Sequence, residues 1–245
     1  MKRTALLVVV GLAACAGTPR PPVIVEPLSW VESTPTGLRT MSSDTPPPLA
    51  YAQEVTGPPA PASALAGEGF SPAGEERGVK LYRRPRDRGI ELACEGRLAG
   101  GPERVLRVLI DYPGHMRWQK HLKGQQILGK GDGFVDVYER LELPVLDDRD
   151  FTLHVTWGAE GDLRWMRFAT VLSGGPPPVD GVVRVTAHSG NWLLQPIDGG
   201  QRTYAVYRFH IDLAGSFPPW LGSSQATTDM ADLFANIDRE LPRYP

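Results

Sequence analysis

The sequence predicts an α+β domain in which a long C-terminal helix covers a curved antiparallel β-sheet, an arrangement that can leave an internal hydrophobic cavity between the two layers. Two observations predict this fold. Between residues 78 and 213, segments of alternating apolar and polar residues follow one another, separated by glycines and prolines, as in an antiparallel meander. Apolar residues from Ala226 to Leu241 then recur at spacings of three and four, which places them on one face of a helix. Because the concave face of such a sheet needs an apolar cover, we expect this helix to lie over it.

The individual elements follow from the same periodicity. Pro102 can open a helix as its first residue, and Pro113-Gly114 ends it. Gly131-Asp132-Gly133 predicts a hairpin turn. We expect residues 182–187 and 191–196 to form a further hairpin with each other. The predicted strands are 78–86, 89–98, 125–128, 134–143, 150–157, 163–172, 182–187, 191–196 and 203–213.

Composition and charge exclude several classes of protein. The 245 residues contain 26 Lys and Arg against 28 Asp and Glu, so the net charge is −2, which argues against nucleic-acid binding through a basic surface. Two cysteines cannot form a disulfide framework. The five histidines lack metal-ligand spacing, and no Gly-x-Ser-x-Gly motif occurs. We therefore expect no cofactor, no metal and no catalytic residues.

Residues 1–14 have the features of a signal peptide. Lys2 and Arg3 precede an apolar stretch of about ten residues, which is too short to span a bilayer as a helix. The stretch ends in Leu-Ala-Ala-Cys, which resembles the lipobox of bacterial lipoproteins. The resemblance implies acylation of Cys15 and, because Ala16 follows it, anchoring in the outer membrane on the periplasmic side. The alternative is an ordinary secretory signal with an incidental cysteine.

A proline-rich tether is predicted between this anchor and the folded domain. Half of the 24 prolines lie in residues 16–76, where apolar side chains are few. Such a composition does not bury enough apolar surface to offset the entropy of ordering the chain. We assign residues 15–75 to a disordered tether and residues 76–245 to the domain. Within the tether, residues 23–31 have enough apolar surface to dock on another surface.

Four short motifs in this domain resemble those of the START family of lipid-transfer domains, which has the helix-grip fold. The resemblance implies a lipid cavity between the sheet and the C-terminal helix, and a hydrophobic ligand. It spans about residues 79–241. The motifs are Asp111 with Trp118, Arg149-Asp150-Phe151, Gly190-Asn191-Trp192 with Pro196, and Asp212 through Gly215 and Pro218 to Trp220-Leu221.

The candidate cavity-lining residues are those that alternate on the predicted inner face of the strands or lie on the apolar stripe of the C-terminal helix. Dry hollows with a few polar groups are typical binding sites for apolar ligands. The candidates are Val137, Glu139, Leu141, Phe151, Leu153, Val155, Trp157, Tyr207, Phe209, Met230, Phe234 and Ile237.

Glu139 is the one charged residue among these candidates. An unpaired buried carboxylate is unfavourable, so it needs a partner, water or a proton. One interpretation is that Glu139 contacts the polar group of the ligand; the other is that the strand bulges and exposes it. The START resemblance implies an arginine partner on the next strand, but Val155 occupies that position.

These observations predict a non-enzymatic lipoprotein of the cell envelope that binds a lipid or another hydrophobic small molecule, with transfer of that ligand between membranes as a further expectation. Two alternatives stay open. One is an aromatase/cyclase-like enzyme of the same superfamily, with Glu139 as its acid or base. The other is an envelope interaction module with a filled core.

Overall fold

The computed structural model describes residues 30–34, 37–41, 49–50, 57–119, 121–142, 146–214 and 225–245. Cys15, the signal peptide and the last part of the fourth motif, residues 215–221, lie outside these ranges. A small separate sheet pairs β1 (Trp30–Thr34) with β2 (Gly37–Met41).

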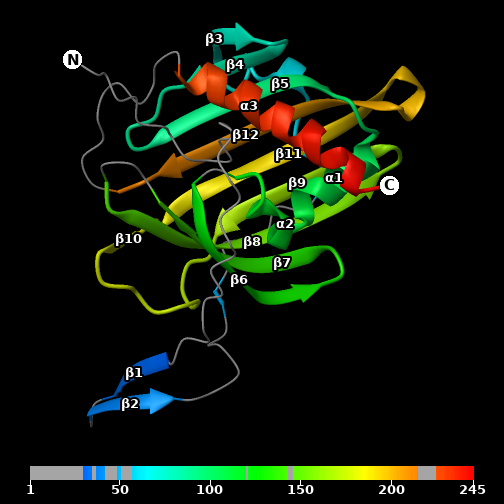
Figure 1. Cartoon of the computed structure of the whole chain (residues 1–245). Coiled ribbons are helices and arrows are strands. Elements are labelled where there is room, and N and C mark those ends of the chain that lie inside the picture. The colour runs from blue at the N-terminus through cyan, green and yellow to red at the C-terminus, as the bar shows by residue number, and fades with distance from the viewer. Residues whose placement is uncertain are drawn as a thin grey trace, which may run out of the picture.

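One ten-stranded curved sheet dominates the molecule (Figure 1). Its strands are antiparallel to their neighbours except for β10 (Val182–Arg184), which pairs in parallel with β8. Across the sheet, the remaining strands run in the order β3 (Ser71–Glu76), β4 (Val79–Arg84), β5 (Ile90–Leu98), β12 (Arg202–Asp212), β11 (Ala187–Ile197), β9 (Leu163–Thr170), β8 (Asp148–Glu160), β7 (Phe134–Leu141) and β6 (Leu122–Gly131).

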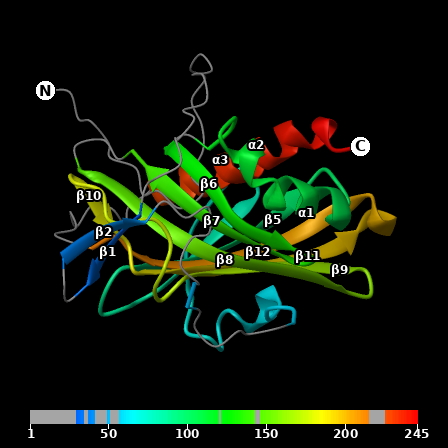
Figure 2. The same ribbon diagram turned by 90° about the horizontal axis from the view of Figure 1, so that it is seen from below.

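The helices cover one face of this sheet, which we call the inner face (Figure 2). They are α1 (Pro102–Ile110), the single turn α2 (Tyr112–His115) and α3 (Gln225–Glu240), followed by the 3₁₀ turn η4 (Leu241–Arg243). The 3₁₀ turn η1 (Ala62–Ala64) lies against the opposite, outer face (Figure 2), and η2 (Asp198–Gly200) joins β11 to β12. This arrangement confirms the predicted helix-grip α+β fold.

Local sequence signals explain several element boundaries. Gly101 is extended and Pro102 is the first residue of α1, where a missing N–H leaves no hydrogen bond unmade. The Gly-Asp-Gly turn joins β6 to β7 as predicted, with Gly131 opposite Phe134. Gly133 has a φ of +78°, a conformation that other residues rarely adopt.

The predicted hairpin of residues 182–187 with 191–196 is wrong. β10 adds to the start of β8 instead, and β11 pairs with β9 and β12. An ion pair fixes β10 in this place, because Arg184 Nε lies 2.6 Å from Oδ1 of the buried Asp150. The amide of Val185 adds a 2.8 Å hydrogen bond to the carbonyl of Asp150. Long-range partners of this kind leave no periodicity in the sequence.

Ordered packing also begins before residue 76. Residues 57–70 cross the outer face and then lead into β3. Leu65 and Phe70 are buried, and together with Ala93 they form a small second core there. The guanidinium of Arg84 lies 4.7 Å from the ring centre of Phe70. Part of the segment assigned above to the tether is thus packed against the domain.

The space under α3 is filled solidly. Ile237 is fully buried, and Sγ of Cys94 lies 3.7 Å from Sδ of Met230. Phe234 packs against β5 at Gly96, where a Cβ atom would lie only 2.9 Å from its ring. α3 contacts β3, β4 and β5, so it covers one half of the inner face. We call this half, represented by Cys94, Met230, Phe234 and Ile237, the solid half.

Candidate ligand-binding site

A cavity of about 60 Å³ lies in the other half of the inner face, which we call the hollow half. Its floor is formed by β7, β8, β9, β11 and β12, and its cover by α1, α2, the turn that follows α2, and one residue of α3. The lining residues are Leu109, Tyr112, His115, Trp118, Gln119, Glu139, Leu141, Phe151, Leu153, Met166, Phe168, His188, Trp192, Tyr207 and Leu233.

The structure brings five of the predicted residues together at this cavity and places the others elsewhere. Glu139, Leu141, Phe151, Leu153 and Tyr207 line it. For the candidates on α3, the reason is the lateral position of this helix, which brings only Leu233 to the cavity. Val137, Val155, Phe209, Met230, Phe234 and Ile237 are buried in the surrounding core, and Trp157 is partly buried against it.

Most residues of the cover were not among the candidates predicted from the sequence. Tyr112, His115, Trp118 and Gln119 all come from the short segment around α2. A four-residue helix has too few residues to show a period, and imidazole and amide side chains do not mark an apolar face. By contrast, strand alternation could have identified the lining residues of β9 and β11, which are Met166, Phe168, His188 and Trp192.

Glu139 faces the cavity and is not on an exposed bulge. It is 5% exposed and lies opposite Phe151 in the β7–β8 register. The amide Nε2 of Gln125 on β6 donates a 2.8 Å hydrogen bond to its Oε1. Burial raises the pKa of Glu139 to about 7, and this hydrogen bond opposes the rise. Val155, the position where the START resemblance implies an arginine partner, pairs with Val135 and is fully buried.

Two buried phenols share this environment. Burial is the main cause that raises the pKa of both Tyr112 and Tyr207 well above the ordinary value, and the negative charge of Glu139 adds to it. Tyr207 also stacks on Trp192, with 4.3 Å between ring centres. At neutral pH both phenols therefore keep their protons beside a carboxyl group that is close to its own pKa.

The two cavity histidines are neutral. Burial lowers the pKa of His115 and of His188 to about 4. The amide of Gln119 lies 3.0 Å from Nδ1 of His115, and Nε2 lies 3.1 Å from the carbonyl oxygen of Leu109, so Nε2 carries the proton. Nδ1 of His188 donates to the carbonyl of His210 at 3.0 Å. Both imidazoles are thus oriented by hydrogen bonds and add no charge to the cavity.

Trp118 supplies an unused polar group in the cavity wall. Its indole Nε1 is buried and has no hydrogen-bond partner among the residues that the structure describes. Leaving such a donor unpaired costs about 1–3 kcal/mol. A ligand that carries a hydrogen-bond acceptor would satisfy it.

Two acidic residues at the start of β8 have structural roles. Asp148 binds Lys123 and Arg140, and Asp150 binds Arg184 and the hydroxyl of Tyr138. Within the described ranges, no group of three or more His, Cys, Asp or Glu residues could hold a metal ion. None of the helices in that part of the chain is long and apolar enough to cross a membrane.

Comparisons with known proteins agree with this geometry at the level of the fold. No family model matches the sequence. An uncharacterized protein of Pseudomonas aeruginosa is 27% identical over 115 residues, which are 46% of this chain and 56% of that protein. The match thus spans only about half the length of this relative.

Solved structures of lipid-transfer domains match over most of the chain. The STAR-related lipid transfer protein from Xanthomonas axonopodis is 25% identical, with a TM-score of 0.62, covering 71% of this chain and 99% of that one. Human StAR-related lipid transfer protein 5 is 21% identical, with a TM-score of 0.63 and coverages of 74% and 95%. Human STARD10 is 17% identical, with a TM-score of 0.64 and coverages of 79% and 85%. The chain described here therefore has the START, or helix-grip, fold of lipid-transfer domains.

Proposed function

We propose that this protein is a lipid-anchored lipoprotein of the cell envelope that binds a lipid or another hydrophobic small molecule in the hollow half, without catalysing a reaction on it. The START fold supports binding of an apolar ligand, and an anchored domain can carry such a ligand between membranes. Transfer of the ligand between membranes is the second part of the proposal and depends on binding.

The observation that carries the proposal is a cavity with a mostly apolar lining that also includes a buried carboxyl group and a tryptophan whose indole N–H is unpaired in the described structure. Glu139 keeps a carboxyl group with a pKa of about 7 inside the cavity, held by one amide. The indole of Trp118 offers a donor without an acceptor in the described structure. A ligand with an apolar body and one polar group that both accepts and donates, such as a hydroxyl or a protonated carboxyl, fits this wall.

The cavity must enlarge to hold such a ligand. Its volume of about 60 Å³ is below the roughly 300–1,000 Å³ of ordinary ligand pockets. α2 is the cover element that can move at the lowest cost, because a single helical turn has little stability of its own. Displacing α2 would leave every strand pairing and the solid half intact.

Acylation of Cys15 would place the domain at a membrane. Two or more acyl chains hold a protein on a bilayer where one chain does not. The lipobox resemblance and the residue after Cys15 favour the outer membrane, with the domain in the periplasm. Labelling of the full chain with radioactive palmitate in a Gram-negative host should mark the wild type and not Cys15→Ser. Equal labelling of both would contradict the anchor.

Native mass spectrometry of the full chain, purified in mild detergent from a Gram-negative host, tests ligand binding. We expect a bound lipid that remains after desolvation. Leu233→Trp should abolish it, because the larger side chain fills the cavity from α3. Leu172→Trp is the matched control, since Leu172 is 69% exposed and is not among the residues that line the cavity.

Native mass spectrometry, together with a turnover assay on the molecule that it identifies, separates the two alternatives. An interaction module with a filled core would carry no lipid in any variant. An enzyme that uses Glu139 as its acid or base would lose turnover completely in Glu139→Gln, whereas a binding protein would only change its affinity, by about tenfold, because the glutamine keeps the size and one acceptor. Absence of lipid from the wild type would overturn the proposal.

A further inference from the structure

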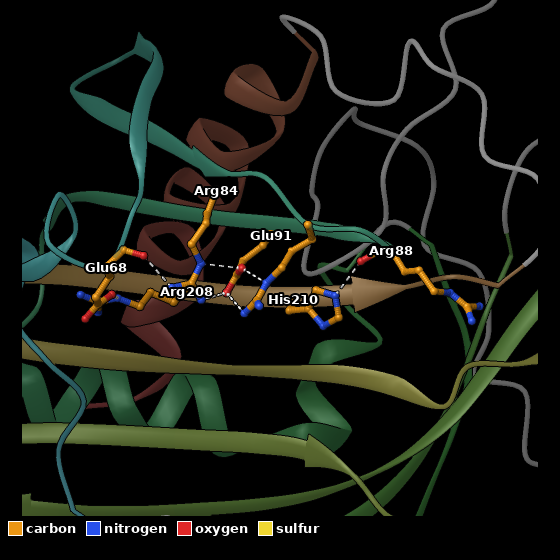
Figure 3. Close-up of polar contacts among 7 residues, drawn as sticks. Glu68, Arg84, Arg88, Glu91, Arg208 and His210 are labelled. Atoms are coloured by element: carbon orange, nitrogen blue, oxygen red, sulfur yellow. Dashed lines mark hydrogen bonds and ion pairs between the residues drawn. The ribbon is translucent and has the colours of Figure 1, made fainter.

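The outer face of the sheet carries a second and larger concavity. This outer groove has a volume of about 420 Å³ and lies between residues 59–70 and the strands β8, β9, β11 and β12. It is on the opposite side of the sheet from the hollow half, and the proposed lipid function makes no use of it. Figure 3 shows part of its polar lining, where Arg208 and Arg84 reach the carboxylates of Glu68 and Glu91.

Three polar residues cross the floor of the outer groove in one row. Asn191 on β11 is in register with Arg208 on β12 and with Arg167 on β9. Because adjacent strands lie about 4.8 Å apart, the two arginines leave the sheet about 10 Å from each other with the amide between them. Their side chains alternate with the inner aromatic residues, so all three point to the outer face.

Arg208 is buried and only partly used. It is 8% exposed, its Nε donates to Glu68 Oε2 at 3.1 Å, and its Nη2 donates to the carbonyl of Pro61 at 2.9 Å. Its Nη1 is buried without a hydrogen-bond partner among the described residues. The amide oxygen Oδ1 of Asn191 is also buried and unpartnered there. The groove floor thus presents an unused charged donor next to an unused acceptor.

The charges of the outer groove favour an anion. Arg84, Arg167 and Arg208 line it against the carboxylates of Glu68 and Glu91. Arg86, which is outside the groove lining, shares Glu91 with Arg84 and offsets the negative charge of that carboxylate. Arg167 donates its Nε to the carbonyl of Gly57 at 2.8 Å. Burial is the main cause that lowers the pKa of Arg167, and the positive charge of Arg208 adds to it.

We propose that the outer groove binds a phosphate monoester, held between Arg208 and Arg167. A phosphate oxygen accepts from Nη1 of Arg208, and guanidinium groups match phosphate geometry well. In its singly protonated form the phosphate has one P–OH group, which donates to Oδ1 of Asn191. Ser189 and Thr156 also line the groove. Their hydroxyl groups donate hydrogen bonds to the remaining phosphate oxygens.

Such a phosphate could belong to a small soluble molecule or to a lipid head group. The test titrates the full chain carrying Cys15→Ser with glycerol 3-phosphate and, separately, with dihexanoyl phosphatidic acid below its micellar concentration. Calorimetry measures affinity, and the Nε–Hε NMR signals of arginine report the site. We expect binding of at least one probe with shifts of the Arg208 and Arg167 signals. Binding of the first probe indicates a soluble source, and binding of the second alone indicates a head group.

Three variants connect binding to the groove. Arg167→Gln should weaken binding about tenfold or more, because a charge-assisted hydrogen bond is lost. Arg208→Lys keeps the positive charge but loses the planar guanidinium group, and it should weaken phosphate binding to a similar extent. Arg202→Gln is the matched control, since Arg202 is on β12 as well but is exposed and outside the groove lining.

If Arg208→Lys does not fold, Arg167→Gln and the NMR shifts decide the question. Two results would overturn the proposal. One is that neither probe binds the folded chain. The other is that binding persists unchanged in Arg167→Gln, or falls equally in Arg202→Gln, which would place the probe in the inner cavity or on the general surface charge. Neither result would overturn the proposed lipid site in the hollow half, whose ligand is tested separately by native mass spectrometry.

Discussion

The solid half and the hollow half of the inner face are covered by different kinds of helix. α3 brings a continuous apolar stripe that packs between the side chains of β4 and β5, and Phe234 closes directly on the backbone at Gly96. Over the hollow half, α1 continues into a single turn that brings imidazole, indole and amide groups to the sheet. The long helix α3 therefore stabilises the domain by close packing, while the short helix α2 covers a cavity that polar groups line.

The contrast also explains why the cavity is small and polar at its edge. Long apolar side chains in regular register interdigitate until no void remains. His115 and Gln119 instead make hydrogen bonds to each other and to the end of α1, so they cannot follow the sheet closely. Glu139 and Trp118 are among the residues that line the remaining cavity.

The largest expected effect comes from truncating side chains of α3 that face the solid half and the hollow half. Ile237→Ala in the solid half should lower the free energy of unfolding by about 2–5 kcal/mol, because it leaves a new cavity. Leu233→Ala, on the same helix, should lower it by roughly half as much, since Leu233 already borders a void. Urea denaturation of the full chain measures both. Equal losses would mean that the two halves are packed alike.

The next effect concerns Glu139. Its pKa in the folded protein is about 7, against an ordinary value of 4.5, so the unfolded chain releases this proton first as the pH rises. Stability should therefore fall between about pH 4.5 and 7 and then level off. Glu139→Gln should remove this fall and raise the free energy of unfolding by about 2–3 kcal/mol at neutral pH.

Urea titrations of Glu139→Gln across this pH range check the prediction. Glu103→Gln is the control, because Glu103 lies on the exposed side of α1. If the pH profile of Glu139→Gln matches that of the wild type, Glu139 is not buried as a titrating group in the hollow half.

His188 should give a smaller effect of opposite slope. Its pKa is lowered from 6.5 to about 4, so the unfolded chain takes up a proton first as the pH falls. Stability is lost as the pH falls from about 6.5 to 4, and at about pH 5 the loss reaches roughly 2 kcal/mol. His188→Phe should remove this loss, because the new ring can pack with Phe151 and Phe168. Thermal unfolding at about pH 5 should then give a higher Tm than the wild type, and an unchanged Tm would contradict the account.

Periodicity predicted most of the fold because burial on one face repeats along each element. The strands, the apolar stripe of α3 and the inward direction of Glu139's neighbours all follow from this repeat. The parallel pairing of β10 with β8 does not follow from this repeat. It depends on an ion pair between Arg184 and Asp150, two residues that are far apart in the sequence.

The sequence predicted an apolar cavity on the inner face, but it did not predict where on that face the cavity lies. Alternation assigns a residue to a face of the sheet and says nothing about where a helix lies across that face. Met230, Phe234 and Ile237 were for this reason assigned to the cavity, although α3 seats them in the solid half. The arginine row of the outer groove was missed for the same reason, since its register becomes visible only when three strands are paired.

Two methionines allow one direct test of the central claim, that the hollow half is where the ligand binds. Met166 lines the cavity, and Met230 lies in the solid half against Cys94. Methyl-labelled methionine in the full chain can be followed by NMR during titration with oleate as the probe. The account predicts that the Met166 methyl signal shifts while that of Met230 stays in place. A shift of Met230 with Met166 unmoved, or no shift of either, would contradict it.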